Sequence, residues 1–441
     1  MVSKNKKIEF SQGNIIWAFF GKIASGVKLV VLGIIVARHL GPSEFGSLNY
    51  TISFVSLLSV LAEFRLQSIL SRELSKENAD INRLLGTSFV ISFIFATIGY
   101  IILSIVSYNM NQHSSIHLFV LIYGLSYFFQ TLRIVRAFYI ANFKNIHVVK
   151  VEVIATILIV LFAFLFVQLN VSLFYFIILR AIDVLVVSLL LLLLYVLNYG
   201  SLIKWRYDNV LRKKLVKDSF PLVLSGFAIM IFQKIDQVML GQMIGVESVG
   251  QYSAAVTIVG FISFVPVIIA ESYAPTLVKM LKKDEYHYNR QNFSDYMIWG
   301  SIFISVILFY LSPFLINTLF GSDYTPAIEV LRVFSLKGVL VSLGAVAAQI
   351  MIVENTHQLA YLKGFLGGFA NVLLNYIFII QYGLIGAAWA SIIAFFLSSY
   401  FSHLLIKRYR YIFVIQTKSI CLGLYNIYYT IQNIYYENKE K

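Results

Sequence analysis

The chain has 441 residues, of which 59% are hydrophobic and only 13% are charged, and its mean hydropathy is +0.80. A soluble domain keeps about a quarter of its residues charged, so this composition excludes a water-soluble protein of two or three domains. The formal net charge of +14 is spread over short loops, which argues against a nucleic-acid-binding patch and favours basic residues that orient helices in a membrane.

Apolar runs of about 20 residues, typical of membrane-spanning helices, recur along nearly the whole chain. Lipid permits only helices or closed barrels, and continuous apolar runs such as residues 184–197 lack the alternation of barrel strands. The first half contains six predicted helices, at residues 14–37, 47–69, 85–108, 116–141, 151–168 and 171–197. The second half contains six more, at residues 219–241, 250–273, 296–318, 327–352, 364–380 and 383–406. Pro275 is predicted to end the helix at 250–273.

The lysines and arginines predict how these helices are oriented. Counted over the loops and termini, 25 of the 35 basic residues fall on one side of the membrane, whereas the other side holds only Arg38. Cytoplasmic loops are the basic ones, so both termini and the 198–218 loop are expected in the cytoplasm. The external loops are all short, which leaves no room for an external catalytic domain.

The resulting fold class is an all-α integral membrane protein with about twelve transmembrane helices in two six-helix lobes. Its expected divisions are an N-terminal lobe (1–197), a cytoplasmic linker (198–218), a C-terminal lobe (219–406) and a cytoplasmic or interfacial tail (407–441). The single cysteine, Cys421, excludes an intrachain disulfide, and the seven histidines lack the spacing of ligands. No metal site and no cofactor are therefore predicted.

Each half carries a similar junction between its first two helices. Residues 40–46 read LGPSEFG, and 204 positions later residues 244–250 read IGVESVG. Two glycines five positions apart suit a tight turn in which one residue needs a positive φ or two helices approach closely. Two ordinary turns could carry the same glycines, but six helices in each half favour a duplicated transporter.

With these junctions the sequence resembles the O-antigen and polysaccharide flippases of the MOP exporter superfamily, relatives of the MATE drug exporters. The resemblance covers most of the chain. It also rests on segments at the junction of the seventh and eighth helices and at the starts of the tenth and twelfth, namely Asp236, Leu240, Gly241, residues 244–252, Phe320, Gly321, Tyr324, residues 327–331 and residues 383–388.

This resemblance implies two lobes around a central cavity and alternating access, with an undecaprenyl-pyrophosphate-linked oligosaccharide carried from the cytoplasmic to the periplasmic leaflet. It implies a multi-pass protein of the cell inner membrane that is not an enzyme. Implied partners are the lipid-linked oligosaccharide, membrane lipid, and a polysaccharide polymerase with its chain-length machinery, but no nucleic acid.

Nine basic residues lie inside predicted helices, where a charge costs about 2.5–3.5 kcal/mol unless it faces a cavity or a partner. Lys22, Lys28, Lys234 and Lys337 lack a suitably placed acid on their own helix. Together with Arg133 they are predicted to line a cationic cavity that binds a pyrophosphate or an acidic sugar. Salt bridges between helices are the competing interpretation.

The remaining intramembrane charges have simpler explanations. Arg180 with Asp183, and Glu329 with Arg332, lie three residues apart and can pair on one helix face, and cavity roles are equally open for them and for Asp236. Arg65 and Arg136 are predicted to extend to the lipid headgroups from helix ends.

Two rival functions differ in what they require of the sequence. An ion-coupled multidrug or small-molecule exporter of the MATE type would need an intramembrane acid with no basic neighbour. A membrane glycosyltransferase or O-antigen polymerase would be expected to have a large external loop, an argument from analogy.

Overall fold

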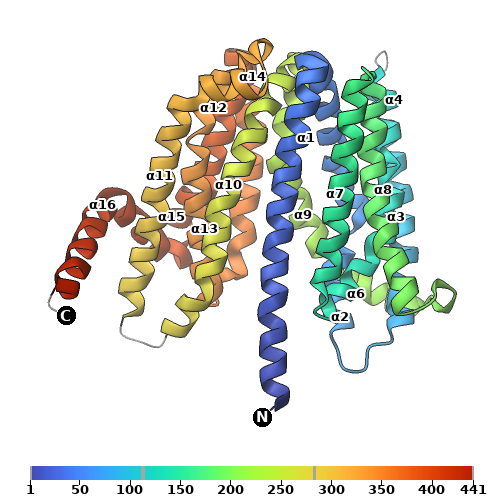
Figure 1. Ribbon diagram of the computed structural model, residues 1–441, viewed down its shortest axis with the longest axis horizontal. Helices are drawn as coiled ribbons and strands as arrows, with labels where there is room; N and C mark the ends of the chain where they lie inside the picture. The colour runs from blue at the N-terminus through green and yellow to red at the C-terminus, as the bar shows by residue number, and fades with distance from the viewer. Residues whose placement is uncertain (1, 111–114, 282–284, 440–441) are drawn as a thin grey trace. The chain divides into compact units, whose positions relative to one another are not determined.

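The computed structural model describes residues 2–110, 115–281 and 285–439. Side chains are described at residue 21 and from residue 26 onward within these ranges, apart from residues 357, 431 and 433–439. Its regular elements are helices (Figure 1). The chain forms two compact units, residues 1–250 and 251–441.

The helices of the first unit are α1 Val2–Glu63, α2 Leu66–Leu74, α3 Ile81–Met110, α4 Ser115–Gly124, α5 Ser126–Thr131, α6 Val135–Ala141, α7 Asn145–Gln168, α8 Leu173–Asn198 and α9 Asn209–Met243. α1 packs against α7 and α9, and α7 packs against α8 (Figure 1). α10, Val246–Met280, begins in this unit and continues into the second.

The second unit continues with α11 Tyr286–Leu319, α12 Ala327–Phe334, α13 Lys337–Val353, α14 Ala360–Phe396, α15 Ser402–Leu405 and α16 Arg410–Lys439. α11 packs against α13 and α16. α10 contains both Pro266 and Pro275. The prediction that Pro275 ends its helix is wrong, because the helix continues to Met280 after it.

The described residues contain ten candidate membrane spans. Two of them, residues 26–74 and 360–405, are 49 and 46 residues long, and at 1.5 Å per residue each is long enough to cross a bilayer twice. Each is broken at one glycine with a positive φ, Gly41 (71°) and Gly383 (59°). Dividing them there gives twelve crossings, which confirms the predicted all-α membrane fold.

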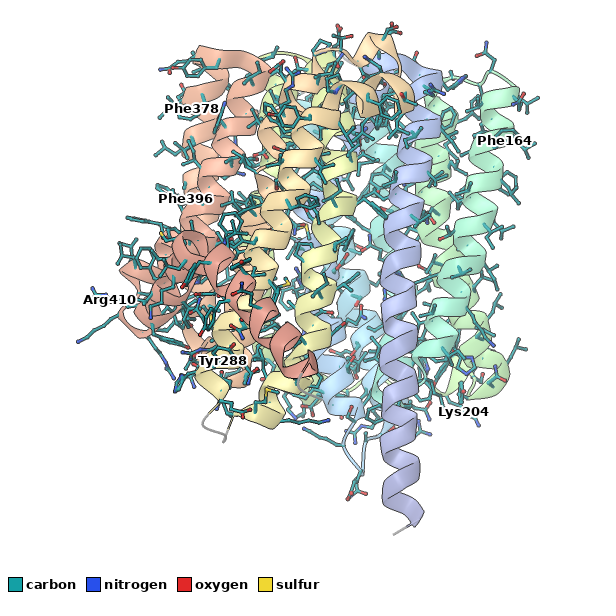
Figure 2. All side chains as sticks on the ribbon, turned by 60° about the vertical axis from the view of Figure 1, so that its left-hand side comes forward. Phe164, Lys204, Tyr288, Phe378, Phe396 and Arg410 are labelled. Carbon is teal, nitrogen blue, oxygen red and sulfur yellow. The ribbon has the colours of Figure 1, made fainter. Side chains whose placement is uncertain are left out.

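The outer surfaces of the helices are apolar. Phe164 projects outward from α7, whereas the charged Lys204 lies in the loop at the other end of the helices (Figure 2). Side chains such as Ile157, Leu161 and Phe164 are about half exposed. An apolar surface of this extent is stable against lipid and not against water.

The two glycine junctions of the repeat meet in the first unit. Gly41 and Gly245 both have a positive φ, which only glycine adopts without strain. A Cβ on Gly46 would lie 1.8 Å from the carbonyl oxygen of Val246, and one on Gly250 would lie 1.9 Å from that of Pro42. The contact is reciprocal between equivalent positions, so in each junction one glycine makes the turn and the other permits close approach.

Candidate functional site

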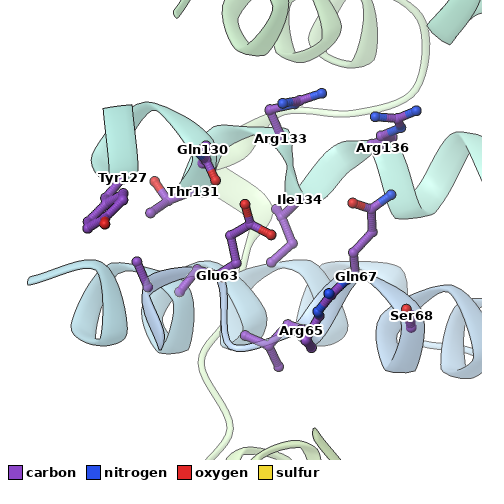
Figure 3. Close-up of a pocket in the computed structure, with 13 residues that line it drawn as sticks. Glu63, Arg65, Gln67, Ser68, Tyr127, Gln130, Thr131, Arg133, Ile134 and Arg136 are labelled. Atoms are coloured by element: carbon purple, nitrogen blue, oxygen red, sulfur yellow. The ribbon is translucent and has the colours of Figure 1, made fainter. Parts of the chain in front are cut away.

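A strained break between α1 and α2 forms one wall of an internal cavity. Phe64 and Arg65, neither of them glycine, both have a φ of 50°. This left-handed conformation is costly for such residues and is found mostly where structure or function requires it. The break ends α1 at Glu63 and starts α2 at Leu66, so Glu63 and Arg65 face the cavity from the point where the helix changes direction (Figure 3).

The opposite wall comes from an irregular stretch of the chain between α5 and α6. A short 3₁₀ turn, Leu132–Ile134, interrupts the helix there and presents Arg133. Arg136 follows in the first turn of α6 (Figure 3). Tight turns of this kind inside a helix commonly mark functional positions or local strain.

The cavity has a volume of about 390 Å³ and lies within the first unit. Polar side chains dominate its lining, which includes Glu63, Arg65, Gln67, Ser68, Ser92, Tyr127, Gln130, Thr131, Arg133 and Arg136. Protein surrounds Glu63, yet its side chain is accessible from the cavity. Three arginines and one carboxylate therefore face a common water-accessible space.

The three arginines differ in how their charges are compensated. Arg136 forms a salt bridge of 3.1 Å to Glu152 of α7, while its Nε is buried without a hydrogen-bond acceptor. Arg133 and Arg65 form no hydrogen bond or salt bridge with any side chain that the structure describes, although Glu63 lies within electrostatic range of both. Their guanidinium groups keep donors that a ligand could use.

Arg65 packs against α9 at Gly226, and this contact helps to fix the position of its side chain. A Cβ on Gly226 would lie 2.5 Å from Nε of Arg65 and 3.1 Å from its Cζ. The guanidinium therefore packs directly on the backbone of α9, in space that only glycine leaves open.

Lys28 has a compensating charge on another helix. Its Nζ donates to both carboxylate oxygens of Asp183 in α8, at 2.5 and 2.6 Å, and the two side chains are 17% and 15% exposed. The spacing in the sequence allows a salt bridge between Arg180 and Asp183 on one helix face. Arg180 forms no such salt bridge in the described part of the chain. Lys28 has no acid on its own helix, as the sequence shows, and its partner on α8 matches the competing interpretation of an interhelical salt bridge. Whether Lys28 also binds substrate stays a prediction.

The Lys28–Asp183 pair lies near the cavity. Tyr123 is within electrostatic range of Asp183, Arg180 and Glu63, and Arg133 is within range of Asp183 as well as Glu63. Of the predicted residues, the structure therefore brings Lys28, Arg133, Arg180 and Asp183 into one region of the first unit.

The other predicted residues are distributed as follows. The side chain of Lys22 lies outside those that the structure describes. Lys234 is half-buried and Asp236 is buried, both on α9. Lys337 lies in the second unit, where its Nζ is 5.1 and 4.7 Å from the ring centroids of Phe334 and Phe395. Whether the four lysines share one cavity stays a prediction.

Glu329 and Arg332, also in the second unit, form the local salt bridge that their spacing allows, at 2.7 Å. Arg65 and Arg136, which the sequence predicts to extend to the lipid headgroups, both line the cavity. Their reach to headgroups stays a prediction. The sequence does show that each of these arginines has another charged residue close by. Glu63 lies two positions before Arg65, and Arg133 lies three positions before Arg136. No group of three or more potential metal-ligating side chains occurs among the residues described.

The polysaccharide biosynthesis protein family model matches residues 12–281, more than half of the chain. The chain belongs to this family. No curated protein sequence matches it.

Two solved structures are similar over nearly the whole length. One is the lipid II flippase MurJ in an inward closed conformation, with a TM-score of 0.65 and 18% identity over 96% of this chain and 93% of that one. The other is an inward-facing multidrug resistance MATE family transporter of the MOP superfamily, with a TM-score of 0.65 and 14% identity over 90% of this chain and 96% of that one. The chain therefore has the fold of these two transport proteins.

Proposed function

We propose that this protein is a flippase that moves an undecaprenyl-pyrophosphate-linked oligosaccharide, an O-antigen or related repeat unit, from the cytoplasmic to the periplasmic leaflet. The arginine-lined cavity of the first unit carries the proposal. Guanidinium groups bind phosphate oxygens through paired, charge-assisted hydrogen bonds, and Arg65 and Arg133 have such donors available. Membership of the polysaccharide biosynthesis family and the MOP fold support the same substrate class.

The carboxylate of Glu63 suits a carrier that must also release its cargo. In the absence of substrate it partly compensates Arg65 and Arg133, which lowers the cost of burying them. With a pyrophosphate in the cavity it opposes the bound anion, so the site holds the headgroup without trapping it. Alternating access of the two halves would then expose the cavity to each leaflet in turn, in the cell inner membrane.

The test is expression in a bacterial strain that lacks its own flippase. Surface glycan should return with the wild-type chain and fail to return with the Arg65→Gln/Arg133→Gln variant at equal membrane level. Full surface glycan from that variant would rule out the cavity as the headgroup site.

An ion-coupled exporter of the MATE type is the second candidate, and one observation favours it. Asp295 of α11 is completely buried and accepts hydrogen bonds from Ser419 (2.5 Å), Gln291 (2.8 Å) and Asn426 (2.9 Å). No described lysine or arginine forms a salt bridge with it. If Asp295 binds a coupling ion, Asp295→Asn should abolish the response of transport in vesicles to an imposed proton or sodium gradient.

A further inference from the structure

We propose that the groove between α3 and the start of α9 is a binding site for an anionic phospholipid, with its phosphate on α9 and an acyl chain along α3. The groove has a volume of about 570 Å³. It lies within the first unit and shares no lining residue with the arginine cavity. The proposal does not depend on the transported substrate.

One wall of the groove is apolar and the other is basic. α3 contributes Ile91, Ile94 and Phe95, while α9 contributes Arg212, Lys213, Val216, Lys217 and Phe220. Ile94 and Phe220 are 45% and 55% exposed, so apolar surface is left uncovered beside three cations. Phospholipids have the complementary pattern, an acyl chain joined to a negatively charged phosphate.

The charges of α9 are divided between two faces of the helix. On the face toward α2, Lys214 pairs with Glu73 at 2.9 Å, and Asp218 pairs with Arg72 at 2.6 Å. The groove face holds the other three cations of this segment. The acids that flank this segment are engaged elsewhere, because Asp218 pairs with Arg72 and Asp208 forms a salt bridge with Arg83.

The three groove cations have no partner among the described side chains. Arg212, Lys213 and Lys217 form no salt bridge or hydrogen bond there, and the Nε of Arg212 is buried without an acceptor. A phosphate oxygen would supply that acceptor and neutralise the local charge. Basic pockets between transmembrane helices are a recurrent way in which membrane proteins hold anionic lipid headgroups.

Neighbouring aromatic residues place this end of the groove at the membrane surface. Trp205 precedes α9 and packs against Phe89 of α3, with ring centroids 5.8 Å apart. Tyr207 follows it and is half exposed. Tryptophan and tyrosine concentrate at headgroup level, which is where a phosphate would meet Arg212, Lys213 and Lys217.

The proposal is tested on the purified full-length protein after delipidation, by native mass spectrometry with dioleoylphosphatidylglycerol and with dioleoylphosphatidylcholine. The wild type should bind phosphatidylglycerol preferentially. Each cation near an anionic headgroup contributes a factor of roughly five, so Lys213→Gln/Lys217→Gln should weaken phosphatidylglycerol binding on the order of 30-fold and leave phosphatidylcholine binding unchanged.

Two further variants separate this site from general charge effects. Lys407→Gln/Lys418→Gln removes the same charge from the other unit and should leave the preference intact. Ile94→Trp keeps every cation but fills the apolar groove, and it should reduce phosphatidylglycerol binding. If the cations bound only a soluble anion, filling the groove would not change the binding. Equal binding of the two lipids by the wild type, or an unchanged preference in Lys213→Gln/Lys217→Gln, would overturn the proposal.

Discussion

The individual residues of the site are charged side chains in an otherwise apolar protein, and burying a charge there costs free energy. Arg65, Arg133 and Arg136 face a cavity that also holds Glu63, and Glu152 neutralises Arg136. The nearby carboxylates reduce the cost of burying the cations. Among the described side chains Arg65 and Arg133 have no salt-bridge or hydrogen-bond partner, so an anionic ligand can use their guanidinium groups.

Replacing Arg133 tests this directly. Arg133→Gln removes a charged donor worth about 1.5–3 kcal/mol of binding, so we expect surface glycan to fall roughly tenfold or more at equal protein level. Arg133→Lys should retain part of the activity because the charge survives without the paired geometry. Lys418→Gln, in the exposed tail, is the control and should export normally; equal export by Arg133→Gln and this control would contradict a role in binding.

Lys28 could act either in substrate binding or only as the structural partner of Asp183, and two variants distinguish these roles. Lys28→Gln leaves Asp183 without its partner and should lower the free energy of unfolding by about 2 kcal/mol, measured by thermal unfolding in detergent. The double variant Lys28→Gln/Asp183→Asn removes both charges and should recover most of that loss. Export decides the role: a double variant that is stable and exports normally shows a structural pair, whereas one that is stable and inactive shows that Lys28 contacts substrate.

Gly226 offers a way to move Arg65 without changing its charge. Gly226→Ala places a methyl group where the guanidinium lies, so Arg65 must shift and export should decline severalfold while the protein still folds. Gly260→Ala in α10 is the matched control, since nothing lies within 4 Å of its Cβ position. Equal export by the two variants would mean that the position of Arg65 is unimportant.

At the scale of elements, the two glycine junctions form a single contact. The second glycine of each junction packs on the carbonyl group of the other, Gly46 on Val246 and Gly250 on Pro42. Helices approach this closely only where side chains are absent. The contact joins the turn after the first helix to the start of α10.

Alanine at either junction should therefore disturb the packing of α1 against α10. In Gly46→Ala and Gly250→Ala the new methyl group would lie less than 2 Å from a backbone oxygen, so the backbones must separate. We expect a melting temperature several degrees lower in detergent and reduced export. Gly364→Ala, with open space at its Cβ position, should melt like the wild type, and a junction variant that does the same would show that the contact is not tight in solution.

At the scale of the whole molecule, the distribution of basic residues predicts the topology. Twelve crossings would return the chain to its starting side, and the count of 25 loop and terminal cations against one predicts that this side is the cytoplasm. Alkaline phosphatase fused after residue 441 should be inactive, and the same enzyme inserted at the 319–326 loop should be active. High activity of the C-terminal fusion would refute the orientation.

The same count predicts that the two halves are parallel repeats. Each half begins on the cytoplasmic side after an even number of crossings, so the repeats should be related by rotation about the membrane normal. Single cysteines introduced into the 40–46 and 244–250 junctions are treated with a membrane-impermeant thiol reagent from outside the cell. The reagent should modify the cysteines of both junctions or of neither. Labelling of only one would mean that the halves have opposite orientation.

The membrane class, the helices and the family resemblance can be read from the sequence alone, because they depend on apolar runs, turns and loop charges that are local in the chain. It also indicated that the glycines of residues 40–46 and 244–250 belong together, and the positive φ of Gly41 and Gly245 agrees with that interpretation. Helix ends are less local, and the predicted end at Pro275 is wrong because α10 continues to Met280.

Which charged side chains meet depends on how the helices pack. Lys28 lies 155 positions from Asp183, and the cavity joins the break after Glu63 to a turn some 70 residues later. Helical spacing predicts neighbours three or four residues apart, as it did for Glu329 and Arg332, but it contains no information about which helices pack together. The positions of Arg65 and Arg136 near helix ends therefore do not reveal that both line one cavity, which follows from the packing of α2 against α6.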